Sequence, residues 1–293
     1  MTAPRQVLPG STYLVTRRCS QRQLLLTPSP STNQVFLYVL ALAAKRHGIL
    51  LHAFCVLSNH YHLVLTDPSA RLPAFLQLLD ALVARALNAS LGRWESFWAP
   101  QSFSAVALLS PADILDKTAY TLANPVAAGL VRSARSWPGL WSSPASFGSV
   151  LSVSRPALFF DPKGFLPQSL DLELSAPPGF LSLESFRAQV AAALAEREAL
   201  AASSPDGFLG PERVLSQRPT STPRPHEPRR GLRPRIASRD KWKRIEALRR
   251  LKLFLAAYRD ALDDWCAGRR RVLFPAGTYL MRVVHGASCA GAG

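Results

Sequence analysis

Two histidines one residue apart, His60 and His62, are the residues whose types and spacing most directly suggest chemistry. They open an apolar stretch of strand length, and side chains two apart on a β-strand project from the same face. Two neutral imidazoles so placed can chelate one divalent ion. With six histidines in 293 residues, a chance His-x-His is roughly a one-in-ten event. A second interpretation therefore stays open: two solvated histidines on an edge strand, with Tyr61 packing on the opposite face.

Tyr120 and Asn124 form a second pair, because residues four apart on a helix share a face. The start of that helix is well marked by Ser110-Pro111, with Asp113 three residues after the cap. Asn124 precedes Pro125, which disfavours helical geometry, so we expect it in a last turn or at a kink. By spacing alone, a tyrosine here is more often a half-buried packing residue than a nucleophile.

The elements that must position these residues alternate in a regular order. Strands are predicted over 12–18, 49–57, 61–66 and 103–109, with a further short strand over 23–27; helices are predicted over 35–48 and 73–91, and from 110 onward. The order β-α-β-β-α-β is the split βαβ pattern. It predicts an α+β, ferredoxin-like sandwich with an antiparallel sheet, followed by the helix that carries Tyr120.

The charge distribution points to a polyanionic partner. Lysine and arginine exceed aspartate and glutamate by 35 to 19, and so large a positive balance attracts nucleic acid or an anionic membrane surface. Residues 1–150 hold 12 basic against 5 acidic residues, residues 151–200 hold 4 against 6, and residues 201–293 hold 19 against 8. Two separate basic regions follow.

Cysteine spacing and hydropathy suggest a compartment. The four cysteines are far apart and form no CxxC pair, which favours neither a zinc knuckle nor a disulfide framework. The first ten residues lack an apolar core, and no stretch reaches about 18 uninterrupted apolar residues. We therefore expect a cytoplasmic protein that does not span a membrane; nucleoid association, in a bacterial cell, is expected from its positive charge together with the family resemblance described below.

Composition changes along the chain predict four segments. Residues 1–148 form the domain that holds the candidate chemical residues, 149–202 a linker and helical extension, 203–238 a flexible linker rich in proline and arginine, and 239–293 a basic amphipathic helix and tail. Ser238 is a candidate cap for that last helix, whose apolar stripe runs from Trp242 to Trp265. We expect this C-terminal extension to be helical and partly disordered.

Three stretches together resemble the single-tyrosine HUH transposases, and most of all their REP-associated tyrosine transposase branch. They are Val-Leu-Ser-Asn-His-Tyr-His-Leu-Val-Leu at 56–65, Tyr-Thr-Leu-Ala-Asn-Pro-Val-Ala-Ala-Gly-Leu-Val at 120–131 and Trp-Pro-Gly-Leu-Trp-Ser-Ser at 137–143. The resemblance covers roughly 11–143. Leu57 and Ser58 depart from the family's usual methionine and proline, at positions that do no chemistry.

This resemblance implies roles for individual residues. His60 and His62 would hold a divalent cation, Mg²⁺ or Mn²⁺, with Asn124 as a further ligand or near-ligand, and Tyr120 would be the nucleophile. Its phenol, with an ordinary pKa of about 10, would attack a phosphodiester of single-stranded DNA beside a hairpin or REP-like sequence, leaving a 5′-phosphotyrosine and a free 3′-OH. A monomer is favoured, and a homodimer is possible.

Basic residues at several positions are candidate DNA contacts. We expect phosphate contacts from Arg17 and Arg18 on the first strand and from Arg132 and Arg135 after the tyrosine helix. Non-specific DNA binding is expected from the C-terminal clusters. These clusters include Arg229, Arg230, Lys241, Lys243 and Arg244.

Two rival functions remain. One is a catalytically inactive, domesticated relative that still binds DNA, and the intact His60, His62, Tyr120 and Asn124 argue against it. The other is a metal-dependent hydrolase, since His-x-His begins some zinc enzymes. That fold would require repeated βα units and further His and Asp ligands, which the sequence does not show.

Overall fold

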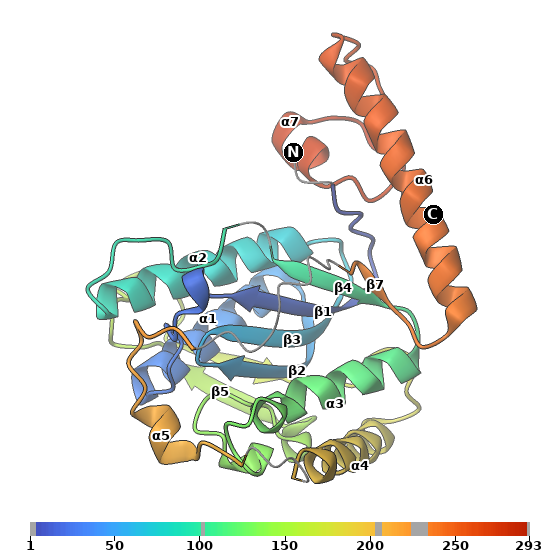
Figure 1. The fold of residues 1–293 in the computed structure, drawn as a ribbon. Helices are drawn as coiled ribbons and strands as arrows, with labels where there is room; N and C mark the ends of the chain where they lie inside the picture. Colours follow the sequence, from blue (N-terminus) through green and yellow to red (C-terminus); the bar gives the residue numbers. More distant parts are fainter. Residues whose placement is uncertain (1–3, 101–102, 203–206, 224–233, 292–293) are drawn as a thin grey trace.

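A five-stranded sheet lies at the centre of the protein, in a computed structural model that describes residues 4–100, 103–202, 207–223 and 234–291 (Figure 1). The sheet has the order β2-β3-β1-β4-β7. Its strands are β1 (Ser11–Arg18), β2 (Leu50–Leu57), β3 (His60–Asp67), β4 (Ser104–Leu108) and β7 (Ile236–Ala237). The pairs β1–β3, β1–β4 and β2–β3 are antiparallel, which confirms the predicted ferredoxin-like α+β order. β7 pairs with β4 in parallel.

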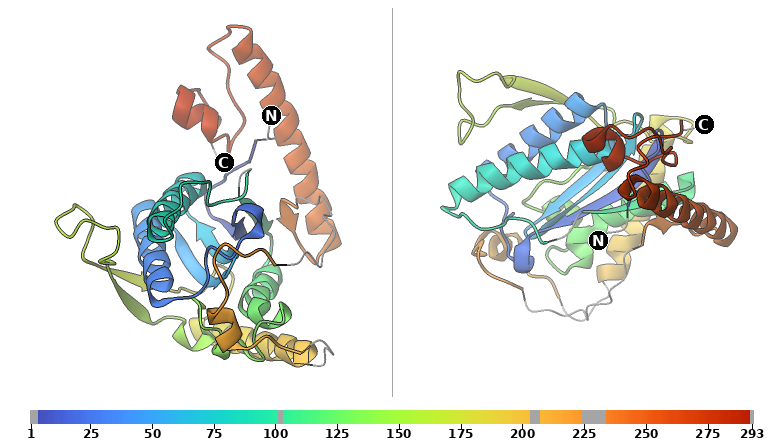
Figure 2. Two further views of the ribbon diagram at one scale, coloured as in Figure 1. Left: turned by 60° about the vertical axis from the view of Figure 1, so that its left-hand side comes forward. Right: turned by 90° about the horizontal axis from the view of Figure 1, so that it is seen from above.

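Helices cover both faces of this sheet (Figures 1 and 2). α1 (Pro30–His47) and α2 (Leu72–Ser90) pack together on one face, while α3 (Pro111–Ala127) lies on the other and packs against α4 (Leu183–Ala202). Ser29 caps α1 by accepting a hydrogen bond from the Thr32 backbone N–H, and Gly48 ends it in the left-handed conformation.

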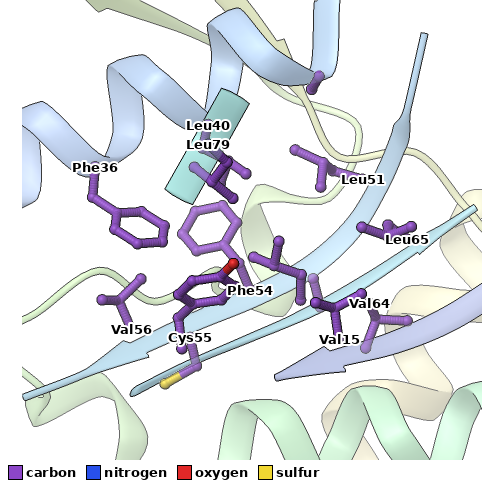
Figure 3. Close-up of a cluster of buried hydrophobic side chains, with 14 of the residues drawn as sticks. Val15, Phe36, Leu40, Leu51, Phe54, Cys55, Val56, Val64, Leu65 and Leu79 are labelled. Carbon is purple, nitrogen blue, oxygen red and sulfur yellow. The ribbon is translucent and has the colours of Figure 1, made fainter. Parts of the chain in front are cut away.

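Apolar side chains fill the α1/α2 face (Figure 3). Phe36 and Leu40 of α1 and Leu79 of α2 lie over strand residues such as Val15 and Phe54, all of them buried. Removing this apolar surface from water is the main force that holds the two layers together. α2 has the length and composition of a membrane-crossing helix. Its apolar residues, however, belong to this core.

The structure corrects two predictions about regular elements. Residues 23–27 form no strand; they follow the 3-10 turn η1 (Ser20–Arg22), and their backbone N–H groups bond to loops, with Leu24 donating to Ser221 O and Leu26 to Ser58 O. A two-stranded sheet of β5 (Val150–Ser154) and β6 (Ser169–Glu173) stands where only a linker was expected. One buried residue in β5 and two in β6 give a pattern too short to identify from the sequence.

The hydrophobic core does not end at residue 148. Val153, Leu170, Phe186 and Val214 belong to the same buried cluster as the central sheet. The segment predicted as linker and helical extension (149–202), and part of 203–238, are therefore one folded body with the predicted catalytic domain. Within 207–223 the chain forms α5 (Pro211–Leu215), contrary to the prediction of a flexible linker. Two further 3-10 turns are η2 (Ala134–Ser136) and η3 (Pro144–Ser146).

The C-terminal region forms a second, smaller cluster. α6 (Lys241–Cys266) projects from the body and packs with α7 (Leu280–His285) around Phe274 (Figure 1). Asp240, not Ser238, caps α6, because its carboxylate accepts from the backbone N–H groups of Trp242 and Lys243. The described part of the extension is helical, as predicted.

The segment at 274–279 docks on the N-terminal arm. Gly277 O accepts from the Val7 backbone N–H at 2.9 Å, and Gln6 bridges to Thr278. Gly277 has φ +86, and a Cβ there would lie 2.6 Å from the Gln6 side chain. The two ends of the chain therefore meet beside β4.

Candidate active site

The register of β1 against β3 sets the environment of the two histidines. Thr16 pairs with His62 and Arg18 with His60, so these four side chains share the face toward α3. The ring centroids of His60 and His62 are 4.8 Å apart and the rings are nearly perpendicular. His62 is buried and His60 half-buried. The predicted pairing of both imidazoles on one face is confirmed.

Hydrogen bonds orient both imidazole rings. His60 Nδ1 lies 2.7 Å from Asn59 Oδ1, and His62 Nδ1 lies 2.8 Å from Thr16 Oγ1. Asn59 Oδ1 is an acceptor, so His60 Nδ1 donates its proton and Nε2 carries the lone pair. The Asn124 amide nitrogen is 3.3 Å from His62 Nε2 and donates to it, which assigns the same tautomer to His62.

Burial keeps both imidazoles neutral. It lowers the pKa of His60 to about 4, assisted by the positive charges of Arg18 and Arg22. Burial, then the neighbouring His60 and Arg18, holds the pKa of His62 well below its usual value near 6.5. Two uncharged rings with Nε2 lone pairs are the form in which histidine binds metals.

α3 brings Tyr120 and Asn124 to the same place. The Tyr120 ring centroid lies 5.5 Å from that of His62, and 37% of the tyrosine is exposed. Asn124 is buried in the last turn of α3, as predicted, and its amide touches His62. Tyr120 is therefore partly exposed beside His62 and lines the same cleft.

The tryptophan motif after α3 holds this helix against the sheet. The Trp141 indole donates to Leu122 O of α3 at 2.9 Å, and the Trp137 indole donates to Val56 O of β2 at 3.0 Å. Gly139 is required because a Cβ would lie 2.5 Å from the Trp137 indole nitrogen. The motif therefore ties the tyrosine helix to β2, the strand that pairs with the histidine strand β3.

A basic cleft of about 580 Å³ opens beside Tyr120 and His62. Its basic lining residues are Arg5, Arg17, Arg18, Lys117 and Arg235, and no carboxylate is present among the described residues that line it. Two of these charges are balanced nearby, since Asp80 pairs with Arg17 at 3.2 Å and Asp116 pairs with Lys117 at 2.9 Å. The cleft remains strongly positive and suits an anionic ligand.

The other predicted basic residues are distributed unevenly. Arg18 is exposed at the cleft, whereas Arg17, although it borders the cleft, directs its side chain to the α1/α2 face, over the Trp98 ring and against Asp80. Arg132 and Arg135 are exposed beyond the end of α3 and do not line the cleft. Arg229 and Arg230 lie outside the described residues. Three other candidates are exposed near the start of α6: Lys241, Lys243 and Arg244.

Sequence patterns missed three residues of this site. Lys117 lies one turn before Tyr120, with its Nζ 5.8 Å from the phenol ring centroid, and helical spacing could have identified it. Asn59 adjoins His60 within the histidine motif, but the sequence alone does not identify it as the hydrogen-bond partner of that ring. Thr16 reaches His62 across the sheet, and no local signal indicates that pairing.

Comparison with known proteins gives fold similarity alone. No protein-family model and no curated protein matches the chain. A solved REP-associated tyrosine transposase bound to a REP hairpin is similar, with 20% identity and a TM-score of 0.41 over 47% of this chain and 81% of the other. A protein from Deinococcus radiodurans assigned as a transposase is similar at 19% identity and a TM-score of 0.30, over 41% of this chain and 95% of the other. Similarity this low leaves the function to be inferred from the site.

Proposed function

We propose that this protein is a metal-dependent endonuclease and transesterase of single-stranded DNA, transposase-like, with Tyr120 as its nucleophile. The observation that carries the proposal is the meeting of one exposed phenol with two neutral imidazoles at the mouth of a basic cleft. The motif resemblance described above independently assigns the same residues to this chemistry.

The donor set fits a divalent cation. His60 and His62 both have Nδ1 held by a hydrogen bond, the arrangement that orients metal-binding histidines and directs Nε2 to the ion. Asn124 would add its amide oxygen as a further ligand. Its side-chain amide, whose nitrogen now donates to His62, would first have to flip so that the oxygen faces the ion. Among the described residues, no group of three or more His, Cys, Asp or Glu side chains is arranged to hold a metal ion, so no carboxylate joins the two imidazoles here. The set is therefore neutral, and two imidazoles favour Mn²⁺ over Mg²⁺.

When bound, the ion would supply Lewis-acid stabilisation of the charge that develops on the scissile phosphate. The Tyr120 oxygen attacks phosphorus and the bond to the 3′ oxygen breaks. The phenol gives up its proton and the departing 3′ oxygen gains one. The products are a 5′-phosphotyrosine and a free 3′-OH, and the reverse attack rejoins DNA without ATP, because the ester retains the bond energy.

We take an unpaired strand as the substrate because the motif resemblance implies single-stranded DNA, and the Tyr120 phenol, 37% exposed, is open to an incoming phosphate. Lys117 and Arg18 flank the phenol and imidazoles and would contact phosphate oxygens. A hairpin with a single-stranded flank is the first substrate to test, since the motif resemblance implies one. The exposed Lys241, Lys243 and Arg244 of α6 would add non-specific, salt-sensitive affinity.

The test is incubation of purified protein with labelled single-stranded hairpin DNA and Mn²⁺. We expect a covalent adduct that survives SDS, that is absent in Tyr120→Phe and strongly reduced in His60→Ala. Tyr258→Phe, a phenol on α6 outside the cleft lining, is the matched control and should react normally. Binding without any adduct in the unaltered protein would instead favour the inactive DNA-binding relative.

A further inference from the structure

The cleft beside Tyr120 continues across β1 to the edge of β4. Thr16 pairs with His62 on one side and with Ser104 on the other, so the β4 edge lies two strand spacings, about 10 Å, from the histidine pair. At this far end the lining includes Phe103, Arg5 and Arg235. The distance leaves room for a bound strand to extend beyond the reacting phosphate.

Opposite ends of the chain supply the two arginines. Arg5 lies on the N-terminal arm, with its guanidinium 4.3 Å from the Phe103 ring centroid and bonded to Phe103 O. Arg235 directly precedes β7; its backbone carbonyl accepts from Ala107 N at 2.9 Å, and its guanidinium donates to Pro4 O. Both guanidinium positions are therefore fixed by backbone contacts rather than left to flexible surface side chains.

Like charge accumulates at this end of the cleft. Burial, and next the positive charge of Arg235, lowers the pKa of Arg5 to about 10, so both groups stay protonated at neutral pH. Two cations held near each other in a half-buried position repel, and an anion between them would relieve that repulsion. Planar guanidinium groups match phosphate oxygens in geometry.

We propose that Arg5 and Arg235 form a phosphate-binding subsite for the DNA strand, a few nucleotides from the scissile phosphate at Tyr120. The identity of the bound strand rests on the proposed function. The subsite makes the N-terminal arm and the segment before β7 parts of the DNA-binding surface. It also explains why β7 is attached to β4: that pairing carries Arg235 to the cleft.

The experiment measures binding of fluorescent, unstructured single-stranded DNA by anisotropy in a Tyr120→Phe background, where no covalent step occurs. We expect Arg5→Gln and Arg235→Gln each to weaken binding about fivefold. Each should also reduce the slope of log affinity against log salt by about 0.7, the value for one lost contact to a single strand. Arg46→Gln, an exposed arginine of α1 on the other face, should change neither quantity.

Oligonucleotides with one neutral methylphosphonate at successive positions identify the contacted phosphate. We expect that a methylphosphonate at one position away from the scissile phosphate weakens binding by the Tyr120→Phe protein. In a Tyr120→Phe protein that also carries Arg235→Gln, the same methylphosphonate should have no further effect. Arg235→Lys, which keeps the charge, should retain the salt slope and show that the fold survives. Unchanged slopes in both glutamine variants, or the absence of any such position, would overturn the subsite.

Failure of the proposed function is distinguishable from failure of the subsite. If the unaltered protein forms no adduct with Mn²⁺ but the arginine and methylphosphonate effects appear, the subsite stands and the enzymatic role fails. If the adduct forms and those effects are missing, the enzymatic role stands and the subsite fails.

Discussion

Each face of the central sheet presents an arginine and a tyrosine, which are packed on the α1/α2 face and exposed on the α3 face. On the α1/α2 face, the buried Tyr61 hydroxyl donates to Asp80 at 2.7 Å, and Asp80 also pairs with Arg17. On the α3 face, Arg18 and His62, next along the same strands, meet the exposed Tyr120 at a cleft. Because side chains alternate along a strand, the packed residues and the residues of the candidate site lie on opposite faces of the sheet. Substitution of the same residue type on each face tests this division.

The two tyrosines should give the largest contrast. Tyr120→Phe removes the proposed nucleophile and should lower adduct formation by about 1,000-fold or more, with folding stability unchanged within about 0.5 kcal/mol. Tyr61→Phe leaves Asp80 without its hydroxyl donor and should destabilise the fold by about 1 to 3 kcal/mol. Gel assays of the adduct and urea unfolding measure the two quantities. A stable, fully active Tyr61→Phe protein would contradict the assignment of Tyr61 to a structural role.

A third histidine, His52, lies at the closed end of the α3 face. Its Nδ1 donates to Ser175 O and its Nε2 accepts from Thr66 Oγ1, each at 2.8 Å. Burial lowers the pKa of His52 to about 4, while an unfolded histidine titrates near 6.5. Between these values the unfolded chain binds more protons, so stability is full above pH 6.5 and is lost as pH falls toward 4.

This difference corresponds to about 3 kcal/mol for His52 alone. We expect the free energy of unfolding, measured by urea titration from pH 7.5 to 4, to fall less steeply in His52→Gln than in the unaltered protein. His52→Gln should still bind Mn²⁺ with ordinary affinity, because His52 has no part in the proposed metal site. Identical pH profiles for the two proteins would show that His52 is not held neutral.

Local sequence patterns predicted which side chains meet on the open face better than the contacts that hold them there. Alternation placed His60 and His62 on one side of β3, and four-residue spacing placed Tyr120 with Asn124. These predictions succeeded because each depends only on the geometry of one element. Thr16 was missed because its partner lies 46 residues away across a strand register. Arg5 and Arg235 were missed because the chain ends meet only through β7 and the docked 274–279 segment.

The C-terminal half was harder to predict for a physical reason. β5 has one buried residue, Val153, β6 has two that alternate over five positions, and Val214 is the buried residue of a short helix. Such short segments acquire structure from contacts with the main core, not from their own periodicity. Proline and arginine content therefore suggested a linker where part of the chain is packed.

Thr16 offers a test of the metal site that leaves its ligands in place. Thr16→Val removes the oxygen that accepts from His62 Nδ1, and loss of such a partner lowers metal affinity about 10- to 100-fold. Calorimetric titration with Mn²⁺ measures this directly. Thr12→Val, on the same face but bonded to Thr66, is the matched control and should bind Mn²⁺ normally. Equal affinity in both variants would argue that His62 is not a ligand.

The two arginines of β1 should show the smallest effect on DNA. Arg18→Gln removes one exposed charge at the cleft, so single-stranded DNA affinity should fall only a few-fold and the salt slope by about 0.7, with stability unchanged.

Arg17→Gln should leave the DNA slope intact, because the Arg17 side chain faces α2. It should cost about 2 kcal/mol of folding stability by leaving the buried Asp80 without its cation. Loss of Arg17 should also raise the pKa of Asp80, which burial already raises to about 6. The loss of folding stability in Arg17→Gln should therefore grow above that pH. If instead Arg17→Gln lowers the salt slope as much as Arg18→Gln does, then both side chains reach the DNA, and strand alternation does not divide this sheet into a packing face and a reactive face.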